Sequence, residues 1–269
     1  MLSKLKIKLK TNKKLPNHLG CIFHSIFLAC LGKDIAGNLH EGDHGYRPYR
    51  SMIKKISENI YEWNVVGLTD EMSDCILKDY QQSFIRKHYI QTFDAYLEPI
   101  EESVIETLEL NELYKKHYSN HEIDTNLFSI NFNTPTAFKS EGKYILLPSE
   151  NQVLQSLLNK WDFSSNGIKL FDYDLLNLLI KSINIYRINN IQTVVFPMDT
   201  TNLKGFCGDV TYKLNHSTKQ LKQLMAMLFE FSTFSGVGIK TAMGMGDISV
   251  VSTVPFDRLR DRVVEHKQS

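Results

Sequence analysis

Segments with the apolar period of strands and of helices alternate in the same order twice along this chain, which limits the folds open to it. The predicted strands of the first half cover residues 3–11, 59–68 and 88–110, and its predicted helices cover 17–32 and 71–84. In the second half, strands are predicted at 127–133, 183–198, 206–214 and 247–253, and helices at 150–161, 172–182 and 217–232. This order predicts an α+β fold of two tandem ferredoxin-like (RRM-like) domains.

Two stretches fall outside the periodic segments. Residues 33–57 are mixed, and Gly42 and Gly45 indicate a loop there. The acidic, polar stretch 111–125 is the best candidate for a linker, which divides the chain into domains 1–124 and 125–269. Each part is long enough to bury its own core.

The overall charge is not typical of a protein that coats nucleic acid without sequence specificity, because the net charge is +1 and the isoelectric point is near 7.7. The charge is uneven, however. Residues 1–14 contain six lysines and no acidic residue, whereas 94–124 is rich in glutamate. A basic face is therefore compatible with a neutral total, and solvated surface charge is the plainer interpretation.

The four cysteines form no C-x-x-C pair and lie in apolar patterns, which is typical of reduced thiols in the cytoplasm. The strand-like N-terminus predicts no signal peptide. The longest apolar run, residues 21–31, is too short to span a bilayer and is interrupted by His24 and Ser25. A cytoplasmic protein without a membrane segment is expected.

Four glycines occur within eleven residues near the C-terminus, as Gly236-Val-Gly238 and Gly244-Met-Gly246. A helix-period run precedes them and a strand-like run follows, which is the reverse of the usual order in nucleotide-binding glycine loops. Such a loop lets the backbone adopt positive φ angles or lie flat against a ligand. A tight helix-to-strand connection without a ligand is the alternative.

The segment 236–246 resembles the signature loop of the repeat-associated (RAMP) RNA-binding proteins of CRISPR systems, in particular their precursor-RNA endoribonuclease (Cas-six) family. Three other segments are similar to the same family: the strand and Thr-Pro-Thr turn of 127–139, the strand 204–213, and Leu39-His40-Glu41 after the first helix. Their order agrees with the family over residues 3–253.

The resemblance implies a metal-independent endoribonuclease that cuts CRISPR precursor RNA within its repeats, without a cofactor. Attack by the 2′-hydroxyl would leave 5′-hydroxyl and 2′,3′-cyclic phosphate ends. The implied partners are single-stranded or weakly hairpinned repeat RNA and a CRISPR effector complex, and a homodimer is left open. Two alternatives remain: a catalytically silent RAMP subunit that binds guide RNA, and an unrelated ferredoxin-like enzyme or regulator.

Histidines suit the acid–base steps of this reaction because their pKa lies near neutrality. The resemblance places His40 at the catalytic histidine position. It places His24, or Ser25 with a one-residue shift, at the family's second site on the first helix. The family's usual lysine is absent, and Arg47 stands nearest to it, with His44 as an alternative. Arginine can stabilise a phosphate but is a poor proton donor.

The candidate RNA-binding residues share a position in the glycine loop or beside a predicted turn. They are Gly236, Gly238, Lys240, Gly244, Gly246, Arg50 and Lys139, with Lys160 as a weaker candidate. No metal site is predicted. His40 and His44 have the spacing of a helical pair, but Gly42 and Asp43 between them argue against a helix there.

Overall fold

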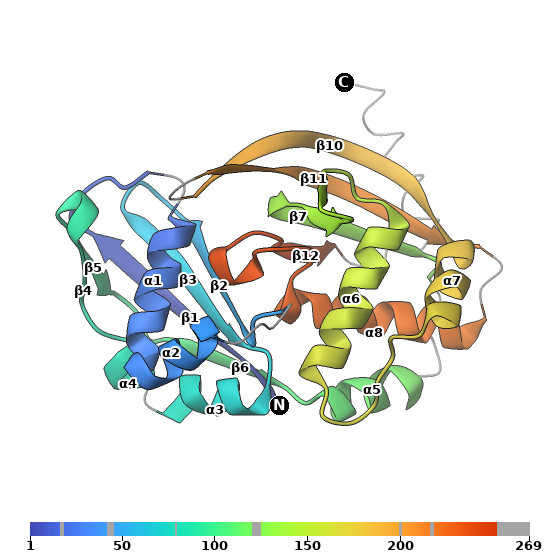
Figure 1. Ribbon diagram of the computed structural model, residues 1–269, viewed down its shortest axis with the longest axis horizontal. Helices are drawn as coiled ribbons and strands as arrows, with labels where there is room; N and C mark the ends of the chain where they lie inside the picture. The colour runs from blue at the N-terminus through green and yellow to red at the C-terminus, as the bar shows by residue number, and fades with distance from the viewer. Residues whose placement is uncertain are drawn as a thin grey trace, which may run out of the picture.

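The computed structural model describes residues 1–16, 19–41, 46–78, 80–119, 125–198, 201–215 and 218–251, without the side chains of Asn38, His40 and Glu41. Two antiparallel sheets lie side by side, each with helices packed on one face (Figure 1). Each half contains the strand–helix–strand–strand–helix–strand order of a ferredoxin-like unit, with its strands in the corresponding spatial order. The predicted fold class is confirmed.

The first sheet has the order β2-β3-β1-β5-β4, and β6 pairs with β1 beside β5. Its strands are β1 (Leu2–Thr11), β2 (Tyr49–Lys55), β3 (Ile60–Gly67), β4 (His88–Ile90), β5 (Ala95–Pro99) and β6 (Val104–Leu108). The helices of this half are α1 (Gly20–Leu31), α2 (Lys33–Glu41), α3 (Asp70–Lys78), α4 (Tyr80–Ser83) and the 3₁₀ turn η1 (Gln91–Phe93).

The second sheet has the order β10-β11-β7-β12 and a separate small hairpin, β8–β9. Its strands are β7 (Leu127–Thr136), β8 (Phe138–Ser140), β9 (Lys143–Ile145), β10 (Ile183–Pro197), β11 (Asn202–Leu214) and β12 (Ile248–Val251). The helices are α5 (Leu110–Ser119), α6 (Glu150–Ser164), α7 (Tyr173–Ser182), α8 (Lys219–Ser235) and the 3₁₀ turn η2 (Thr241–Met243).

Local sequence explains why the main elements begin and end where they do. In β1, Leu5, Ile7 and Leu9 alternate with lysines, so one face enters the core beneath α1 and α3. The hydroxyl of Thr218 accepts a hydrogen bond from the Leu221 amide and caps the start of α8. That helix ends at Gly236, which has a φ of 64°.

The two halves share buried apolar contacts. The core between α6, α8 and the second sheet also includes Leu2, Val66 and Leu68 from the first half. The strands of the two sheets do lie on either side of the predicted boundary at 124/125, but residues 120–124 are outside the described part of the chain. The division into domains 1–124 and 125–269 stays a prediction.

The structure adds to the sequence interpretation at two places. The mixed stretch 33–57 contains α2 and β2, and Gly42 and Gly45, where a loop was expected, lie outside the described residues. The expected linker begins instead as α5, whose Leu110 and Leu113 are buried in the second core. The polar residues that suggested a linker form the outer face of this helix, and two of them, Lys116 and His117, contact Glu230 of α8.

The lysine-rich N-terminus does not form a free basic face. Antiparallel pairing places Glu106 of β6 opposite Lys4, and this carboxylate pairs with both Lys4 and Lys6. Lys8, Lys13 and Lys14 pair with Glu101, Asp94 and Glu58. Acids of the first half therefore neutralise five of the six lysines, and RNA contacts are better sought elsewhere.

Among the described helices, none is long and apolar enough to span a membrane. All four cysteines are free thiols.

The contact between α5 and α8 should contribute stability that depends on pH. Hydrogen bonds from His117 and Lys116 lower the pKa of Glu230 to about 2. Because the folded pKa lies below the ordinary 4.5, this stability is present above pH 4.5 and is lost as pH falls toward 2. Solvent screens the partly exposed pair, so Glu230→Gln should lower the free energy of unfolding by about 0.5–1 kcal/mol at pH 6. Urea denaturation from pH 6 to 3 measures this difference.

Glu112→Gln is the matched control, because Glu112 forms only an exposed pair with Lys115 within α5. A Glu230→Gln effect that stays constant from pH 6 to 3 would contradict the assignment of the stabilisation to the charged carboxylate.

Candidate functional site

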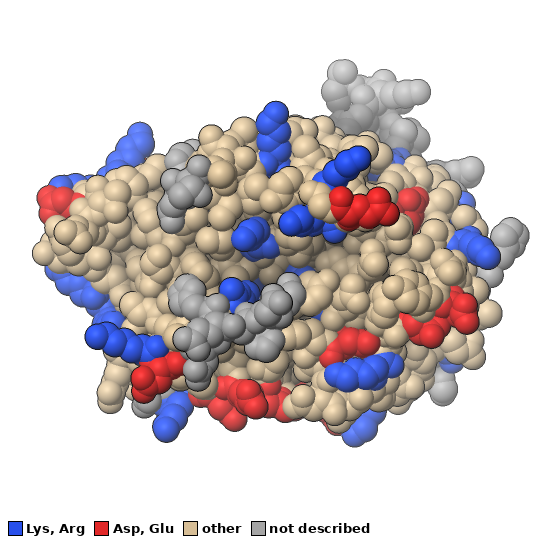
Figure 2. Space-filling view, in the orientation of Figure 1, with Lys and Arg blue, Asp and Glu red and all other residues tan. Residues whose placement is uncertain are grey.

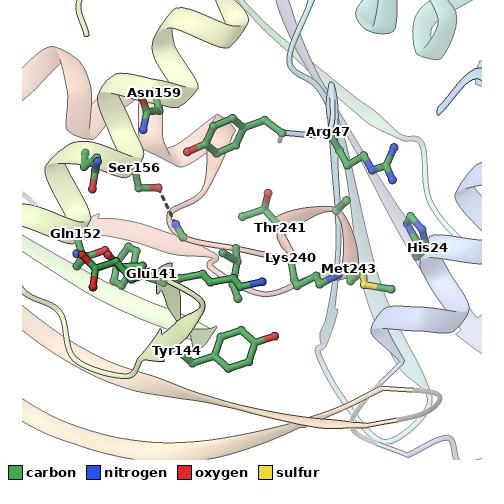
Figure 3. A pocket seen from close by; sticks show the side chains of 18 residues that line it. His24, Arg47, Glu141, Tyr144, Gln152, Ser156, Asn159, Lys240, Thr241 and Met243 are labelled. Carbon is green, nitrogen blue, oxygen red and sulfur yellow. Dashed lines mark hydrogen bonds between the residues drawn. The ribbon is translucent and has the colours of Figure 1, made fainter. Parts of the chain in front are cut away.

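A pocket of about 890 Å³ lies between the first half and the second half (Figure 3). The first half contributes His24 of α1 together with Tyr46 and Arg47, which precede β2. The second half contributes α6, the β8–β9 hairpin and the glycine loop, of which residues 238–243 line the pocket. The sequence-predicted residues His24, Arg47, Lys139, Gly238 and Lys240 therefore meet around one cavity.

Tyr49 of β2 orients the His24 ring. The Tyr49 hydroxyl lies 3.4 Å from Nδ1 of His24, and the two rings are stacked with centroids 5.9 Å apart. Burial raises the pKa of Tyr49 to about 12, so the phenol keeps its proton at neutral pH. The hydroxyl can therefore donate to Nδ1, an arrangement that leaves Nε2 to carry the ring proton. Ser25, the alternative to His24, is exposed and does not line the pocket.

Arg47 joins the pocket to the end of α2. Its guanidinium donates a hydrogen bond to the carbonyl of Leu39, the residue immediately before His40. Cations favour the C-terminal turn of a helix, where carbonyl groups lack partners within the helix. This contact places the end of α2, and with it the backbone of His40, beside the first-half wall of the pocket.

Gly20 allows α1 to approach the glycine loop closely. A Cβ at this position would lie 2.1 Å from the carbonyl oxygen of Met243 and 2.6 Å from the ring of Phe196. His24 lies one helical turn after Gly20 in α1. Because Gly20 has no side chain, α1 can pack closely on the glycine loop, and this packing brings His24 near the loop. The sequence interpretation missed this glycine because it lies inside an ordinary apolar helix pattern.

The glycines of the loop are required chiefly by contacts within the protein. A Cβ on Gly246 would lie 2.0 Å from the carbonyl of Val237, and one on Gly238 would lie 2.4 Å from the carbonyl of Ala137. Gly236 and Gly244 have positive φ angles of 64° and 95°. Of these four, only Gly238 lines the pocket, so the loop brings Lys240 to the cavity by folding tightly on itself.

Two buried basic side chains hold the C-terminal end of α8. Arg50 of β2 pairs with Asp247 and donates to the carbonyls of Thr233 and Phe234 at 3.4 and 3.3 Å. Lys160 of α6 donates to the carbonyls of Ser235 and Gly236 at 3.1 and 3.2 Å. Burial, and secondarily the charge of Arg50, lowers the pKa of Lys160 well below its ordinary value. Together they satisfy carbonyls that have no partner within the helix.

The structure therefore removes Arg50 and Lys160 from the residues predicted to bind RNA. Their side chains are 2% and 3% exposed, and the two terminal nitrogens of Arg50 and Nζ of Lys160 are already engaged with Asp247 and with carbonyls at the end of α8. Both residues support the glycine loop from beneath and are out of reach of RNA.

The second-half wall is polar. Four side chains from α6 line it: Gln152, Gln155, Ser156 and Asn159. Ser156 accepts a hydrogen bond from the Gly238 amide at 2.9 Å, which ties α6 to the glycine loop. Tyr144 and Lys139 reach the pocket from the β8–β9 hairpin. The sequence interpretation missed the amides, although their spacing along the predicted helix 150–161 places them on one face.

The electrostatics of the pocket suit an anion. Among the described residues that line it, Arg47, Lys139 and Lys240 stand against one carboxylate, that of Glu141. Lys139 and Lys240 are exposed to solvent. Figure 2 shows Lys and Arg side chains gathered around a hollow in the middle of this face. Within the described ranges, no group of three or more His, Cys, Asp or Glu side chains is arranged to hold a metal ion.

Comparison with known proteins identifies the family. A family model described as CRISPR-associated endoribonuclease Cas6 matches residues 130–248. A CRISPR-associated endoribonuclease Cas6 from Streptococcus thermophilus is 30% identical over 233 residues, which cover 85% of this chain and 89% of the relative. The chain belongs to the Cas6 family. The Cas6 endoribonuclease of Mycobacterium tuberculosis H37Rv is 26% identical over 240 residues, or 89% of this chain and 74% of the relative.

Solved Cas6 structures have the same fold. A Cas6 product complex matches with a TM-score of 0.75 at 19% identity, covering 93% of this chain and 99% of that one. Thermus thermophilus Cas6 matches with a TM-score of 0.71 at 20% identity, covering 93% and 98%. At these identities the likeness establishes the architecture, and the roles of individual side chains must come from the site itself.

In this Cas6 protein, two of the histidine candidates cannot be compared with the pocket directly. His40 lies in α2, but its side chain is outside the described part of the structure, and His44 lies wholly outside it. The catalytic role of His40 stays a prediction, as do the RNA contacts of Lys139, Lys240 and the loop glycines.

Gly20→Ala should separate α1 from the glycine loop. Because its Cβ would meet a backbone carbonyl, we expect the free energy of unfolding to fall by about 1–3 kcal/mol, as for an overpacked core site. Gly37→Ala is the control, since Gly37 lies inside α2 with nothing within 4 Å of its Cβ position. The control should gain about 0.5–1 kcal/mol. Urea denaturation compares them, and equal stabilities would contradict the close approach.

Arg50→Met should leave Asp247 buried without its ion-pair partner, a change that typically costs about 3–5 kcal/mol. Adding Asp247→Asn removes the unpaired charge and should restore part of the loss. Lys54→Met is the control, because Lys54 is exposed on the same strand, and it should change stability by less than about 0.5 kcal/mol. Chemical denaturation measures all three, and an Arg50→Met variant as stable as Lys54→Met would refute this role.

Proposed function

We propose that this Cas6 protein cuts CRISPR precursor RNA within its repeats, at the pocket between its two halves. The observation that carries the proposal is the convergence of His24, Arg47, Lys139 and Lys240 on one cavity beside the end of α2. Relatives named CRISPR-associated endoribonuclease, and a related Cas6 structure described as a product complex, support the same activity.

The proposed reaction uses the RNA's own 2′-hydroxyl. This oxygen attacks the adjacent phosphorus, the bond from phosphorus to the 5′-oxygen breaks, and the leaving oxygen takes a proton. The products are a 2′,3′-cyclic phosphate and a 5′-hydroxyl. A general base removes the 2′ proton, a general acid supplies the proton to the leaving group, and a cation stabilises the charge on the phosphorane. No step requires a metal ion.

We assign these roles to residues at the first-half wall. His24 is assigned as the general acid, because its imidazolium form carries a proton on Nε2 that can pass to the leaving 5′-oxygen and leave a neutral ring, while Nδ1 stays beside the Tyr49 hydroxyl. His40, at the end of α2, is assigned as the partner in acid–base catalysis. Arg47 is assigned to the phosphate, because a guanidinium remains charged at every relevant pH and binds phosphate oxygens with paired donors.

We assign Lys139 and Lys240 to the RNA backbone on either side of the cut, because both are exposed cations of the pocket lining. We further propose that the protein acts in the cytoplasm and that the cut RNA passes to a CRISPR effector complex. The homodimer stays a prediction.

The deciding test is incubation of the host's repeat RNA with purified protein in excess EDTA. The wild type should make a single cut that leaves a cyclic phosphate, at a rate unaffected by removal of metal. His40→Ala should lower the single-turnover rate by about 100-fold or more, the contribution typical of a general acid or base. Its affinity for the RNA should stay within about threefold, because acid–base chemistry acts on the transition state.

His117→Gln is the matched control, since His117 lies on α5, contacts Glu230 and does not line the pocket. Its cleavage rate should equal that of the wild type. Tight binding without a cut by the wild type would refute catalysis and favour a silent RNA-binding subunit. A cut that survives in His40→Ala would move the chemistry to His24, His44 or Arg47.

A further inference from the structure

The second-half wall of the pocket contains polar groups that the proposed chemistry does not use. Gln152 and Gln155 of α6 face the cavity, and both are half-buried. Their neighbours on this wall are engaged within the protein: Ser156 bonds the Gly238 amide, and Asn159 hydrogen-bonds Tyr46. Across the described side chains, by contrast, neither glutamine amide has a hydrogen-bond partner.

Half-buried amides without partners favour a polar occupant. Each amide presents one acceptor and two donors, and burying these without hydrogen bonds is unfavourable. An apolar ligand would leave them unsatisfied. A phosphate would satisfy only the donors. The edges of nucleobases offer donors and acceptors side by side, which is the pattern that an amide pairs with.

Tyr144 supplies a flat apolar surface at the same wall. It is 50% exposed, lines the pocket from β9, and stacks on no other ring in the described part of the chain. Figure 3 shows Tyr144 and Gln152 on the second-half side of the pocket, across from His24 and Arg47. Exposed aromatic rings are the usual platforms on which unpaired bases stack.

We propose that this wall, defined as Tyr144, Gln152 and Gln155, binds one unpaired base of the RNA and reads its identity. The base stacks on Tyr144 while its edge pairs with the two amides. Lys139, in β8 of the same hairpin as Tyr144 and three residues after the end of β7 at Thr136, is placed to hold the phosphate of that nucleotide. This inference rests on the proposed function, because it assigns the base specificity of the same pocket.

Binding to a panel of repeat RNAs tests the reading of the base. Each RNA carries one of the four bases at one unpaired position near the cut, and affinity is measured in a His40→Ala background so that no RNA is consumed. At one position the affinity should differ between bases by about 5- to 100-fold, the discrimination typical of an amide–base pair. Gln152→Leu and Gln155→Leu, which keep the side-chain size, should each reduce this difference to about threefold or less. Discrimination that both substitutions leave unchanged would overturn the proposal.

Asn151→Leu is the matched control, because Asn151 is an exposed amide on the same helix that does not line the pocket. It should keep the full discrimination. Equal loss in Asn151→Leu would assign the effect to α6 as a whole and would also overturn the proposal.

Substitutions of Tyr144 test the stacking separately. Tyr144→Ala should weaken binding of every RNA in the panel by about 5- to 100-fold, whereas Tyr144→Phe keeps the ring and should bind like the wild type. Tyr173→Ala is the control, since Tyr173 is 70% exposed and lies away from the pocket. If Tyr144→Ala binds as the wild type does, stacking is refuted.

The two levels of the proposal can fail independently. A wild-type protein that neither binds nor cuts repeat RNA would refute the proposed function. A wild-type protein that cuts repeat RNA equally well with all four bases at every unpaired position would refute only the reading of the base.

Discussion

The capping of α8 by Arg50 and Lys160 is the interaction on which the rest of the site depends. The last carbonyls of a helix have no partners within it, and here they are buried where water cannot serve them. Arg50 comes from the first half and Lys160 from the second, so one helix end is bound from both sides. The ion pair with Asp247 balances part of the charge and fixes the chain between the glycine loop and β12.

Two further contacts turn this anchor into a pocket. The glycine loop begins where α8 ends, and η2 within it lies against Gly20 at the start of α1. Beneath the loop, Ser156 holds the Gly238 amide to α6. The halves are therefore joined at the loop, and the pocket opens beside that joint with histidine and arginine on one wall and amides on the other. Contacts of this kind suit a nuclease, because its acid, base and phosphate-binding groups must be held in alignment.

Much of the architecture was predictable from local sequence. Alternation in residues 3–11 and the apolar helix ending at Gly32 correspond to β1 and α1, and the second-half elements match within a few residues. The elements missed were α2, β2, α5 and the β8–β9 hairpin, which are short segments rich in polar residues. Among the site residues, His24, Arg47, Lys139, Gly238 and Lys240 were named from the sequence, but only the structure shows that they line one pocket, and their roles stay predictions. Arg50 was assigned to RNA and is buried.

The sequence by itself determined the two ferredoxin-like units, the family and the residue types that meet at the pocket, because periodicity and motif order are local properties of the chain. Only the tertiary structure decided which basic side chains reach the pocket. Arg50 and Arg47 lie three residues apart and both bond carbonyls near a helix end, yet Arg50 is buried against α8 whereas Arg47 lines the cavity. The same holds for Gly20 and the α6 amides, whose roles depend on partners distant in the sequence.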